Sequence, residues 1–139
     1  MLTNTQTKLI KWGDCDPAGI VFYPRYFAWF DAATAALFAA AGLPIHRLFP
    51  DYEIAGMPLV DTRARFIVPS KFGAEVRIET TITEFRRSSF DVRHQVFRDD
   101  TLGVEGFETR VWTIRDPENS ERIKSQTIPA EVIALFTKA

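Results

Sequence analysis

A long apolar run, which begins at a proline and stops before a glycine, constrains the fold of this chain more than any other feature. Pro24 has a ring-fixed φ and no backbone N–H, so it suits the first turn of a helix, and Gly42 suits the left-handed position that ends one. We therefore predict a helix over residues 24–41. Apolar residues occur on almost every side of it, which predicts a helix that is buried all round and wrapped by strands.

Much of the remaining chain shows the period of two that is typical of β-strands. Residues 76–82 and 90–96 alternate apolar and polar side chains, and residues 86–89 between them suit a hairpin, so these strands should be antiparallel neighbours. The other expected segments are strands at 7–12, 59–68 and 105–114, a short helix from Pro129, and a long irregular stretch at 43–58. This order predicts an α+β fold, in which an antiparallel sheet of about five strands packs on one long central helix.

Length and composition set limits on organisation and partners. With 139 residues the chain fits a single domain, residues 1–139. Its net charge is −1 and 25% of its residues are charged, so neither disorder nor attraction to nucleic acid is expected. No apolar run reaches the roughly 20 residues that span a bilayer and no signal pattern is present, so we expect no membrane partner and a cytoplasmic location. The single cysteine, Cys15, excludes an internal disulfide and a Cys-rich zinc site.

The loop before the helix places carboxylates near its N-terminus. Asp14 and Asp16 are two residues apart, but Pro17 and Gly19 turn the chain, so only one of the two need point at the helix. Asp16 precedes a proline, which favours an extended conformation and projects its side chain beside the helix mouth. The opening turn offers unpaired N–H groups and a partial positive charge that can stabilise an oxyanion. Acyl transfer with Asp16 as base or nucleophile is one hypothesis, and a structural cap of the turn or helix is the other.

Metal and thiol chemistry find less support in the same loop. An Asp-x-Asp-x-x-Gly sequence also opens a calcium loop, but Ala18 at the fifth position and Arg25 at the twelfth cannot supply the ligands, so no metal is expected. A Cys15 nucleophile would need a base, and the spacing of neither His46 nor His94 argues for a partnership. His94 lies on an apolar strand face, which is typical of a core histidine with satisfied hydrogen bonds.

Basic residues cluster at the predicted hairpin and on a later segment. Arg86 and Arg87 lie at the hairpin, and Arg122 and Lys124 follow further along the chain. Guanidinium groups bind phosphate oxygens bidentately, so this set could hold a phosphorylated ligand. A solvated hairpin whose charge opposes aggregation remains an equal alternative.

Taken together, these motifs resemble the 4-hydroxybenzoyl-CoA thioesterase family of the hotdog fold over nearly the whole chain. The matching residues are Trp12-Gly13-Asp14-Cys15-Asp16-Pro17-Ala18-Gly19-Ile20-Val21, Tyr23-Pro24, Asp31, Gly42-Leu43-Pro44, Arg86-Arg87 before Ser89-Phe90, and Glu121-Arg122 leading to Pro129. By this resemblance, Asp16 attacks the thioester or activates water, and the backbone N–H of Tyr23 polarises the thioester carbonyl. Asp31 would help to form the acyl pocket across a subunit interface.

The resemblance also implies the remaining binding residues. The phosphates of coenzyme A would meet Arg86, Arg87, Arg122 and Lys124. Met57 stands where the family pattern has a threonine near the aryl group, and Ser88 stands where it has a lysine. The expected protein is a hydrolase and homo-oligomer, a homodimer or dimer of dimers, that needs no cofactor.

The expected activity is hydrolysis of a small acyl-CoA thioester, with an aromatic acyl group of the benzoyl or hydroxybenzoyl type. A short-chain aliphatic acyl-CoA is the alternative substrate. Two other functions are alternatives: a hydratase of acyl-CoA, whose branch of the fold usually relies on a histidine that is missing near Asp16, and a non-catalytic module that binds acyl-CoA or a protein partner.

Overall fold

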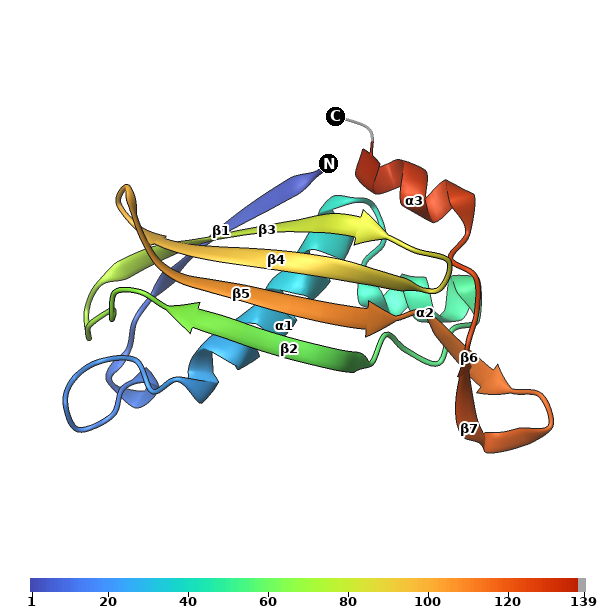
Figure 1. Cartoon of the computed structure of the whole chain (residues 1–139), viewed down its shortest axis with the longest axis horizontal. Helices are drawn as coiled ribbons and strands as arrows, with labels where there is room; N and C mark the ends of the chain where they lie inside the picture. The colour runs from blue at the N-terminus through green and yellow to red at the C-terminus, as the bar shows by residue number, and fades with distance from the viewer. Residues whose placement is uncertain (138–139) are drawn as a thin grey trace.

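The computed structural model describes residues 1–137 (Figure 1). Its main sheet is antiparallel, has five strands in the order β1-β3-β4-β5-β2, and packs on one face against the long helix α1 (Pro24–Ala40). The strands are β1 (Thr3–Leu9), β2 (Leu59–Phe66), β3 (Glu75–Phe85), β4 (Ser89–Arg98) and β5 (Thr101–Val111). The predicted α+β architecture is confirmed.

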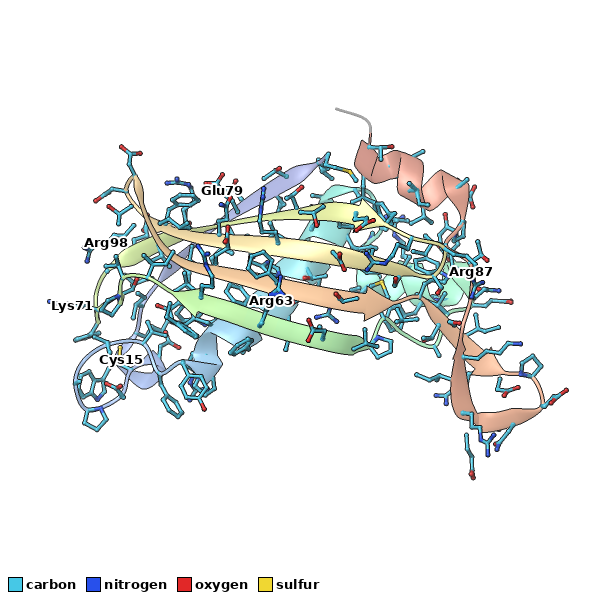
Figure 2. All side chains as sticks on the ribbon, in the orientation of Figure 1. Cys15, Arg63, Lys71, Glu79, Arg87 and Arg98 are labelled. Atoms are coloured by element: carbon cyan, nitrogen blue, oxygen red, sulfur yellow. The ribbon has the colours of Figure 1, made fainter. Side chains whose placement is uncertain are left out.

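The hairpin of β3 and β4 forms because both strands carry apolar side chains at every second position. The inward-facing residues of β4, Phe90, Val92, His94 and Val96, are all buried against α1. The backbone N–H of Arg86 donates to the carbonyl of Ser89 at 2.8 Å and closes the turn, as predicted. The opposite face of the sheet is polar, with side chains such as Arg63 and Glu79 (Figure 2).

Helix α1 begins at Pro24 as predicted and ends one residue before the predicted end. Gly42 follows it with φ +90°, a conformation that glycine adopts without strain. The expectation that the helix is buried all round is wrong: Trp29, Phe30 and Leu37 are buried, but Ala28 and Ala32 on the other side are exposed. Alanines made the whole surface of the helix apolar, whereas the sheet covers only the face with large side chains.

The predicted irregular stretch contains a second helix, α2 (Ile45–Tyr52). It begins after Pro44 and ends at Tyr52, and the next residue, Glu53, adopts a left-handed conformation with φ 54°. Leu48 is buried against the end of α1, and this contact stabilises a segment that is too short, and too interrupted by Pro50, to be recognised from its pattern. Among residues 1–137 no single helix is long and apolar enough to span a membrane; α1 and α2 together pass on length and composition only, with a 69° bend between them.

Both ends of the sheet differ from the predicted boundaries. β1 lies earlier than the expected strand at 7–12, because Trp12–Asp14 form a 3₁₀ turn instead. The expected strand at 105–114 breaks at the buried Trp112, after which the hairpin of β6 (Thr113–Asp116) and β7 (Asn119–Ser125) leaves the sheet. The terminal helix α3 (Ala130–Thr137) follows Pro129 as expected.

Two groups of buried side chains form the core. One joins the end of α1 to α2 and α3, and the other fixes the start of α1 against the sheet through residues such as Tyr26, Phe30 and Val104. Gly106 in β5 is essential to the second group, because a Cβ atom at this position would lie 2.3 Å from the Phe30 ring. The closeness of the helix to the sheet here sets the position of the loop that precedes it.

Candidate active site

The carboxylate of Asp16 is held by a tight turn. The backbone N–H of Asp16 donates to the carbonyl of Ile20, and that of Gly19 donates to the carbonyl of Asp16, both at 2.9 Å. Gly19 has φ +79°, so the turn requires the left-handed region that glycine occupies freely. One side-chain oxygen, Oδ1, accepts a hydrogen bond from the N–H of Ala18 at 2.9 Å. The turn therefore fixes the side chain as well as the backbone of Asp16.

Long-range backbone bonds fasten this turn to the segment that leads into β3. The N–H of Val21 donates to the carbonyl of Ser70, and the N–H of Phe72 donates to the carbonyl of Gly19, both at 3.0 Å. Ser70 is buried. The loop is thus part of the rigid scaffold, which is what a positioned catalytic group requires.

One backbone donor remains open at the start of α1. Pro24 has no N–H, Arg25 N–H donates to the carbonyl of Phe22 at 2.9 Å, and Tyr26 N–H donates to the carbonyl of Tyr23 at 3.1 Å. Within residues 1–137, the N–H of Tyr23 makes no hydrogen bond. The sequence predicted several unpaired N–H groups, and the structure leaves this one free beside Asp16.

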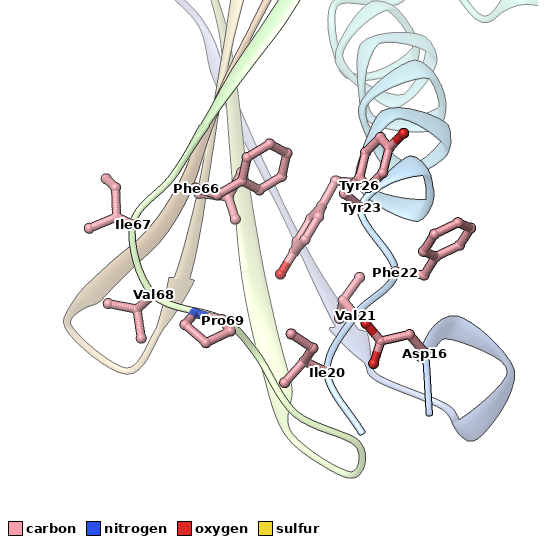
Figure 3. A pocket seen from close by; sticks show the side chains of 11 residues that line it. Asp16, Ile20, Val21, Phe22, Tyr23, Tyr26, Phe66, Ile67, Val68 and Pro69 are labelled. Carbon is pink, nitrogen blue, oxygen red and sulfur yellow. The ribbon is translucent and has the colours of Figure 1, made fainter. Parts of the chain in front are cut away.

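Asp16 and Tyr23 line the same cavity of about 340 Å³ (Figure 3). Phe66, Val68 and Pro69 form the opposite wall, which comes from the end of β2 and the residues after it. The ring of Phe66 lies 6.5 Å from that of Tyr23 and 5.8 Å from that of Tyr26. An apolar, aromatic cavity that is lined by a residue with a free carboxylate oxygen and by one with an open backbone N–H suits a ligand with an apolar body and a polar, reactive group.

The capping hypothesis for Asp16 is met only in part. Its Oδ1 caps its own turn, but no side chain caps α1 at Tyr23. In the part of the chain that the structure describes, Oδ2 of Asp16 accepts no hydrogen bond and remains available for chemistry. The thiol of Cys15 is a poor rival, since desolvation and the charges of Asp14 and Asp16 raise its pKa.

A second cavity, of about 250 Å³, lies further along α1 and contains Asp31 and Met57. The side chain of Asp31 is 71% exposed, yet its Oδ1 accepts a hydrogen bond from Nη2 of Arg110 at 2.7 Å. Nη1 of Arg110 donates to the carbonyl of Met57 at 2.9 Å. The sequence patterns considered above do not predict Arg110 as a site residue, although a charged residue at an inward position of β5 is a usable signal.

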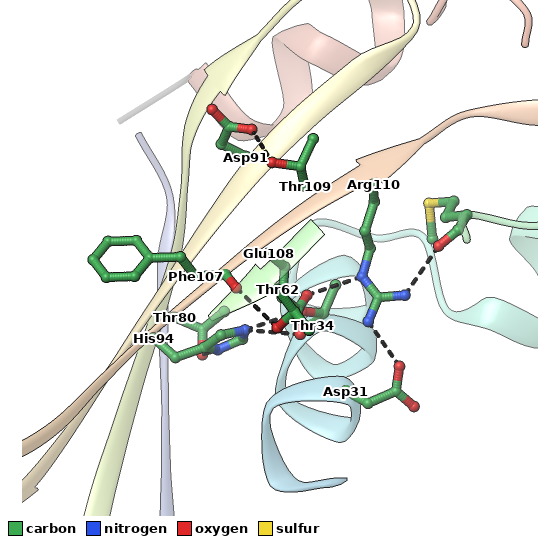
Figure 4. Close-up of polar contacts among 11 residues, drawn as sticks. Asp31, Thr34, Thr62, Thr80, Asp91, His94, Phe107, Glu108, Thr109 and Arg110 are labelled. Atoms are coloured by element: carbon green, nitrogen blue, oxygen red, sulfur yellow. Dashed lines mark hydrogen bonds and ion pairs between the residues drawn. The ribbon is translucent and has the colours of Figure 1, made fainter. Parts of the chain in front are cut away.

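Behind Arg110 lies a buried polar network (Figure 4). Oε1 of Glu108 accepts hydrogen bonds from the Thr34 hydroxyl at 2.7 Å and from Nε of Arg110 at 2.9 Å. Its Oε2 lies 3.3 Å from Nε2 of His94. Burial by itself raises the pKa of Glu108, but the hydrogen bonds and charges of His94 and Arg110 outweigh burial, so the pKa is lowered and the carboxylate stays ionised.

His94 has the core position that the sequence predicted. The side chain is fully buried, and Thr80 Oγ1 lies 2.8 Å from its Nδ1. The ring stacks on Phe30, with centroids 4.6 Å apart and an interplanar angle of 9°. Both ring nitrogens therefore have polar neighbours, and His94 lies away from the cavity that Asp16 lines.

The four predicted phosphate-binding residues differ in how far other side chains already bind them. Arg86 is engaged: it pairs with both oxygens of Asp91, at 2.6 and 3.0 Å, and also donates to Glu84 and Ser89. Arg87 turns the other way and donates to the hydroxyl of Thr127 at 2.9 Å, next to the end of β7. The other two, Arg122 and Lys124, are exposed on β7.

Within one chain, these basic residues lie far from Asp16. Figure 2 shows Cys15, beside Asp16, at one end of the sheet and Arg87 at the other. β3 runs between these ends with eleven residues, and the ten steps from its first to its last Cα atom span about 33 Å at 3.3 Å each. Asp31 and Met57 line a cavity separate from that of Asp16. One chain therefore brings together Asp16 with Tyr23, and Asp31 with Met57, but not the two pairs.

No group of three or more His, Cys, Asp and Glu side chains in residues 1–137 is arranged to hold a metal ion.

Comparisons of sequence and of structure both find thioesterases that are similar to this chain. The chain is 39% identical over 137 residues to the 4-hydroxybenzoyl-CoA thioesterase of Pseudomonas sp. (strain CBS-3), which covers 94% of this chain and 95% of that protein. A solved structure of an Asp-to-Asn mutant of 4-hydroxybenzoyl-CoA thioesterase with 4-hydroxybenzoyl-CoA has a TM-score of 0.88 at 36% identity, over 97% of this chain and 99% of that one.

A gentisyl-coenzyme A thioesterase is also similar, with a TM-score of 0.80 and 31% identity over 97% of this chain and 100% of that one. The family model of the thioesterase-like superfamily matches residues 10–136. The chain therefore belongs to the thioesterase-like superfamily and has the hotdog fold that the resemblance predicted.

Proposed function

We propose that this protein hydrolyses the thioester of a small aromatic acyl-CoA to the free acid and coenzyme A. The observation that carries the proposal is the pairing of Asp16, which has a free carboxylate oxygen, with the open N–H of Tyr23 at the edge of one apolar cavity. Named relatives that act on 4-hydroxybenzoyl-CoA and gentisyl-CoA support both the reaction and the aromatic acyl group.

Two routes use the same two groups. In the first, the Asp16 carboxylate attacks the carbonyl carbon, the C–S bond breaks as the thiolate of coenzyme A leaves, and water then hydrolyses the mixed anhydride. In the second, Asp16 takes a proton from a water molecule that attacks the carbonyl. Either route creates an oxyanion, which the N–H of Tyr23 and the positive end of the α1 dipole stabilise. An Asp-to-Asn mutant crystallised with its substrate, in a protein 36% identical to this one, supports a carboxylate in this role.

The complete site is formed by two copies of the chain. β2 is an edge strand with exposed apolar side chains, among them Val60 at 62% and Phe66 at 53%. If two copies pair antiparallel along β2, the end of one strand, where Phe66 walls the Asp16 cavity, meets the beginning of the other, which follows Met57. Asp31 of the second copy then approaches Asp16 of the first, which makes the protein at least a homodimer.

In this arrangement the acyl and phosphate ends of the substrate have separate partners. Oδ2 of Asp31 can accept a hydrogen bond from a ring hydroxyl, and Met57 supplies an apolar wall. Arg87, Arg122 and Lys124 hold the phosphates of coenzyme A, and Arg86 joins them when its pair with Asp91 opens. We place the enzyme in the cytoplasm, where such thioesters occur, with no further cofactor.

Release of free thiol from a panel of acyl-CoA thioesters tests this function. Benzoyl-, 4-hydroxybenzoyl-, phenylacetyl- and straight-chain acyl-CoA are compared with wild type and with Asp16→Asn. Aryl-selective release that depends on Asp16 is expected. Preference for straight chains would contradict the aromatic substrate, and tight binding without thiol release would contradict the enzyme and favour a binding module.

Light scattering and sedimentation test the dimer. A monomer that hydrolyses the panel at the wild-type rate would overturn the shared site, because one chain keeps Asp16 and Asp31 in different cavities.

A further inference from the structure

We propose that Arg110 is a positioning residue that sets acyl-group selectivity, and that the buried carboxylate of Glu108, braced by His94, holds Arg110 in place. The inference rests on the proposed function, because it concerns the acyl end of that site. It assigns a role to three inward-facing groups of β4 and β5 that touch neither the Asp16 cavity nor the phosphate-binding residues.

The guanidinium of Arg110 links two walls of the Asp31 cavity. Its Nη2 donates to Asp31 on α1 at 2.7 Å, and its Nη1 donates to the carbonyl of Met57, which precedes β2, at 2.9 Å. The Arg110 side chain is 10% exposed, whereas that of Asp31 is 71% exposed. A carboxylate so exposed would sample several rotamers, so the buried partner is what fixes it. Among residues 1–137, only Oδ1 of Asp31 has a hydrogen-bond partner, so Oδ2 is free for a substrate donor.

Glu108 binds Nε, the third nitrogen of the Arg110 guanidinium. Its Oε1 accepts from Nε of Arg110 at 2.9 Å and from the Thr34 hydroxyl at 2.7 Å. Since Thr34 lies one turn after Asp31 on α1, the same carboxylate ties Arg110 to the helix that carries Asp31. Each of the three nitrogens of Arg110 thus has a partner, an arrangement that suits the planar guanidinium group.

His94 completes the chain of contacts from the core side. Nε2 of the ring lies 3.3 Å from Oε2 of Glu108 and 3.4 Å from Oγ1 of Thr34, and Nδ1 lies 2.8 Å from Oγ1 of Thr80. Stacking on Phe30, the residue before Asp31, fixes the plane of the ring. Asp31 is therefore held on two sides: through its side chain by Arg110, and through its backbone neighbour Phe30 by His94.

If Arg110 positions Asp31, selectivity for the acyl group depends on residues outside the cavity in which Asp16 performs the reaction. A ring hydroxyl gains from Asp31 only if Oδ2 is in the right place, and a misplacement of about 1 Å in such a site can cost on the order of a hundredfold in rate. Benzoyl-CoA has no ring hydroxyl that could donate to Asp31, so its rate of hydrolysis should not depend on the position of Asp31. Disturbing Arg110 should therefore reduce the preference for 4-hydroxybenzoyl-CoA over benzoyl-CoA.

The test is a double-mutant cycle of Asp31→Asn and Arg110→Lys on this preference. The ratio of kcat/KM for the two thioesters is measured in wild type, both single variants and the double variant. Arg77→Lys is the matched control, because Arg77 pairs with Glu79 on the opposite face of the sheet. Each single variant should lower the ratio by about tenfold or more, and the double variant should lower it no further, because both changes remove one interaction.

The outcomes separate a positioning role from a structural one. A merely structural Arg110 would lower the rate with both thioesters equally and leave the ratio at the wild-type value, which would overturn the proposal. So would independent, additive effects of the two substitutions. If Arg110→Lys does not fold, Glu108→Gln takes its place: it keeps the size of the side chain, loosens the hold on Arg110 and should lower the same ratio, and an unchanged ratio would contradict us.

Binding to the Asp16→Asn protein distinguishes this inference from the proposed function. The Kd ratio of the two thioesters, measured by calorimetry in that background, does not require turnover. A ratio that Arg110→Lys reduces supports the positioning role even if the wild type proves to be a binding module. If the wild type hydrolyses the thioesters but Arg110→Lys leaves the Kd ratio unchanged, the positioning role of Arg110 is refuted and the proposed enzyme activity stands. If neither thioester binds, both proposals are refuted.

Discussion

Replacing Gly106 with alanine should destabilise the protein by forcing α1 away from the sheet. The added Cβ would lie 2.3, 2.7 and 2.8 Å from three atoms of the Phe30 ring. Carbon atoms in favourable contact are about 3.5–4.0 Å apart, so the ring must move by more than about 1 Å. It has no free space, because Phe30 is 1% exposed and stacks on His94.

The expected cost is about 3 kcal/mol, the upper end of the usual range for an overpacked core, since three contacts are violated at once. For a domain of this size that corresponds to a melting temperature lower by about 10 °C. Urea unfolding followed by circular dichroism at fixed protein concentration measures it. Gly13→Ala is the matched control, with nothing within 4 Å of the added Cβ, and should cost less than about 0.5 kcal/mol.

A second substitution tests the cause. Phe30→Leu removes the ring atoms that the new Cβ would meet, so Gly106→Ala should cost at least about 1 kcal/mol less in that background. An undiminished cost in the double variant, or a Gly106→Ala protein as stable as wild type, would refute the packing explanation.

Three further predictions address charge, assembly and ligand binding. The pKa of Glu108 is lowered from its usual 4.5, so its ionised form contributes stability that is present above about pH 4.5 and lost as the pH falls through the folded-state pKa. The difference in unfolding free energy between wild type and Glu108→Gln, measured by urea titration, should therefore shrink below pH 4.5. A difference that does not change with pH would contradict this. Val60→Glu places a charge on the exposed β2 edge and should dissociate the dimer in sedimentation runs, whereas an intact dimer would move the interface elsewhere. Arg87→Ala should raise KM for acyl-CoA about tenfold with little change in kcat, but leave hydrolysis of a thioester without the nucleotide unchanged; equal losses with both substrates would remove Arg87 from the phosphate site.

Features encoded by neighbouring residues could be predicted from the sequence. Pro24 and Gly42 mark the two ends of α1 to within a residue, and the turn of Asp16 follows from Pro17 and Gly19 within a few positions. Conformations of this kind depend on local sterics, so they need no knowledge of the rest of the fold.

Features that depend on distant contacts could not be predicted from the sequence. α2 owes its stability to Leu48 packing under α1, and its own sequence carries an internal proline. β7 is exposed along its whole length and so lacks the alternation that identifies a strand. The apolar surface of α1 overstated its burial, since small alanines do not reveal which side the sheet covers.

The site shows the same division. Asp16 and Tyr23 lie seven residues apart and are joined by one loop, so their proximity could be inferred, whereas the link from Asp31 to Arg110 spans 79 positions. Glu108 and Arg110 interrupt an otherwise apolar face of β5, and two opposite charges at alternate inward positions indicate a buried pair. The separation of Asp16 from the basic residues depends on the length of the sheet, which only the assembled fold reveals.

Single-turnover thiol release from 4-hydroxybenzoyl-CoA tests whether the Asp16 carboxylate performs the chemistry. Asp16→Asn should release thiol about 10²–10⁴ times more slowly than wild type, with an unchanged melting temperature and retained binding of the thioester. Asp14→Asn, two residues away, is the control and should keep the wild-type rate, because within the described chain the Asp14 side chain accepts a hydrogen bond only from the N–H of Lys11. Equal rates for Asp16→Asn and wild type would contradict the account.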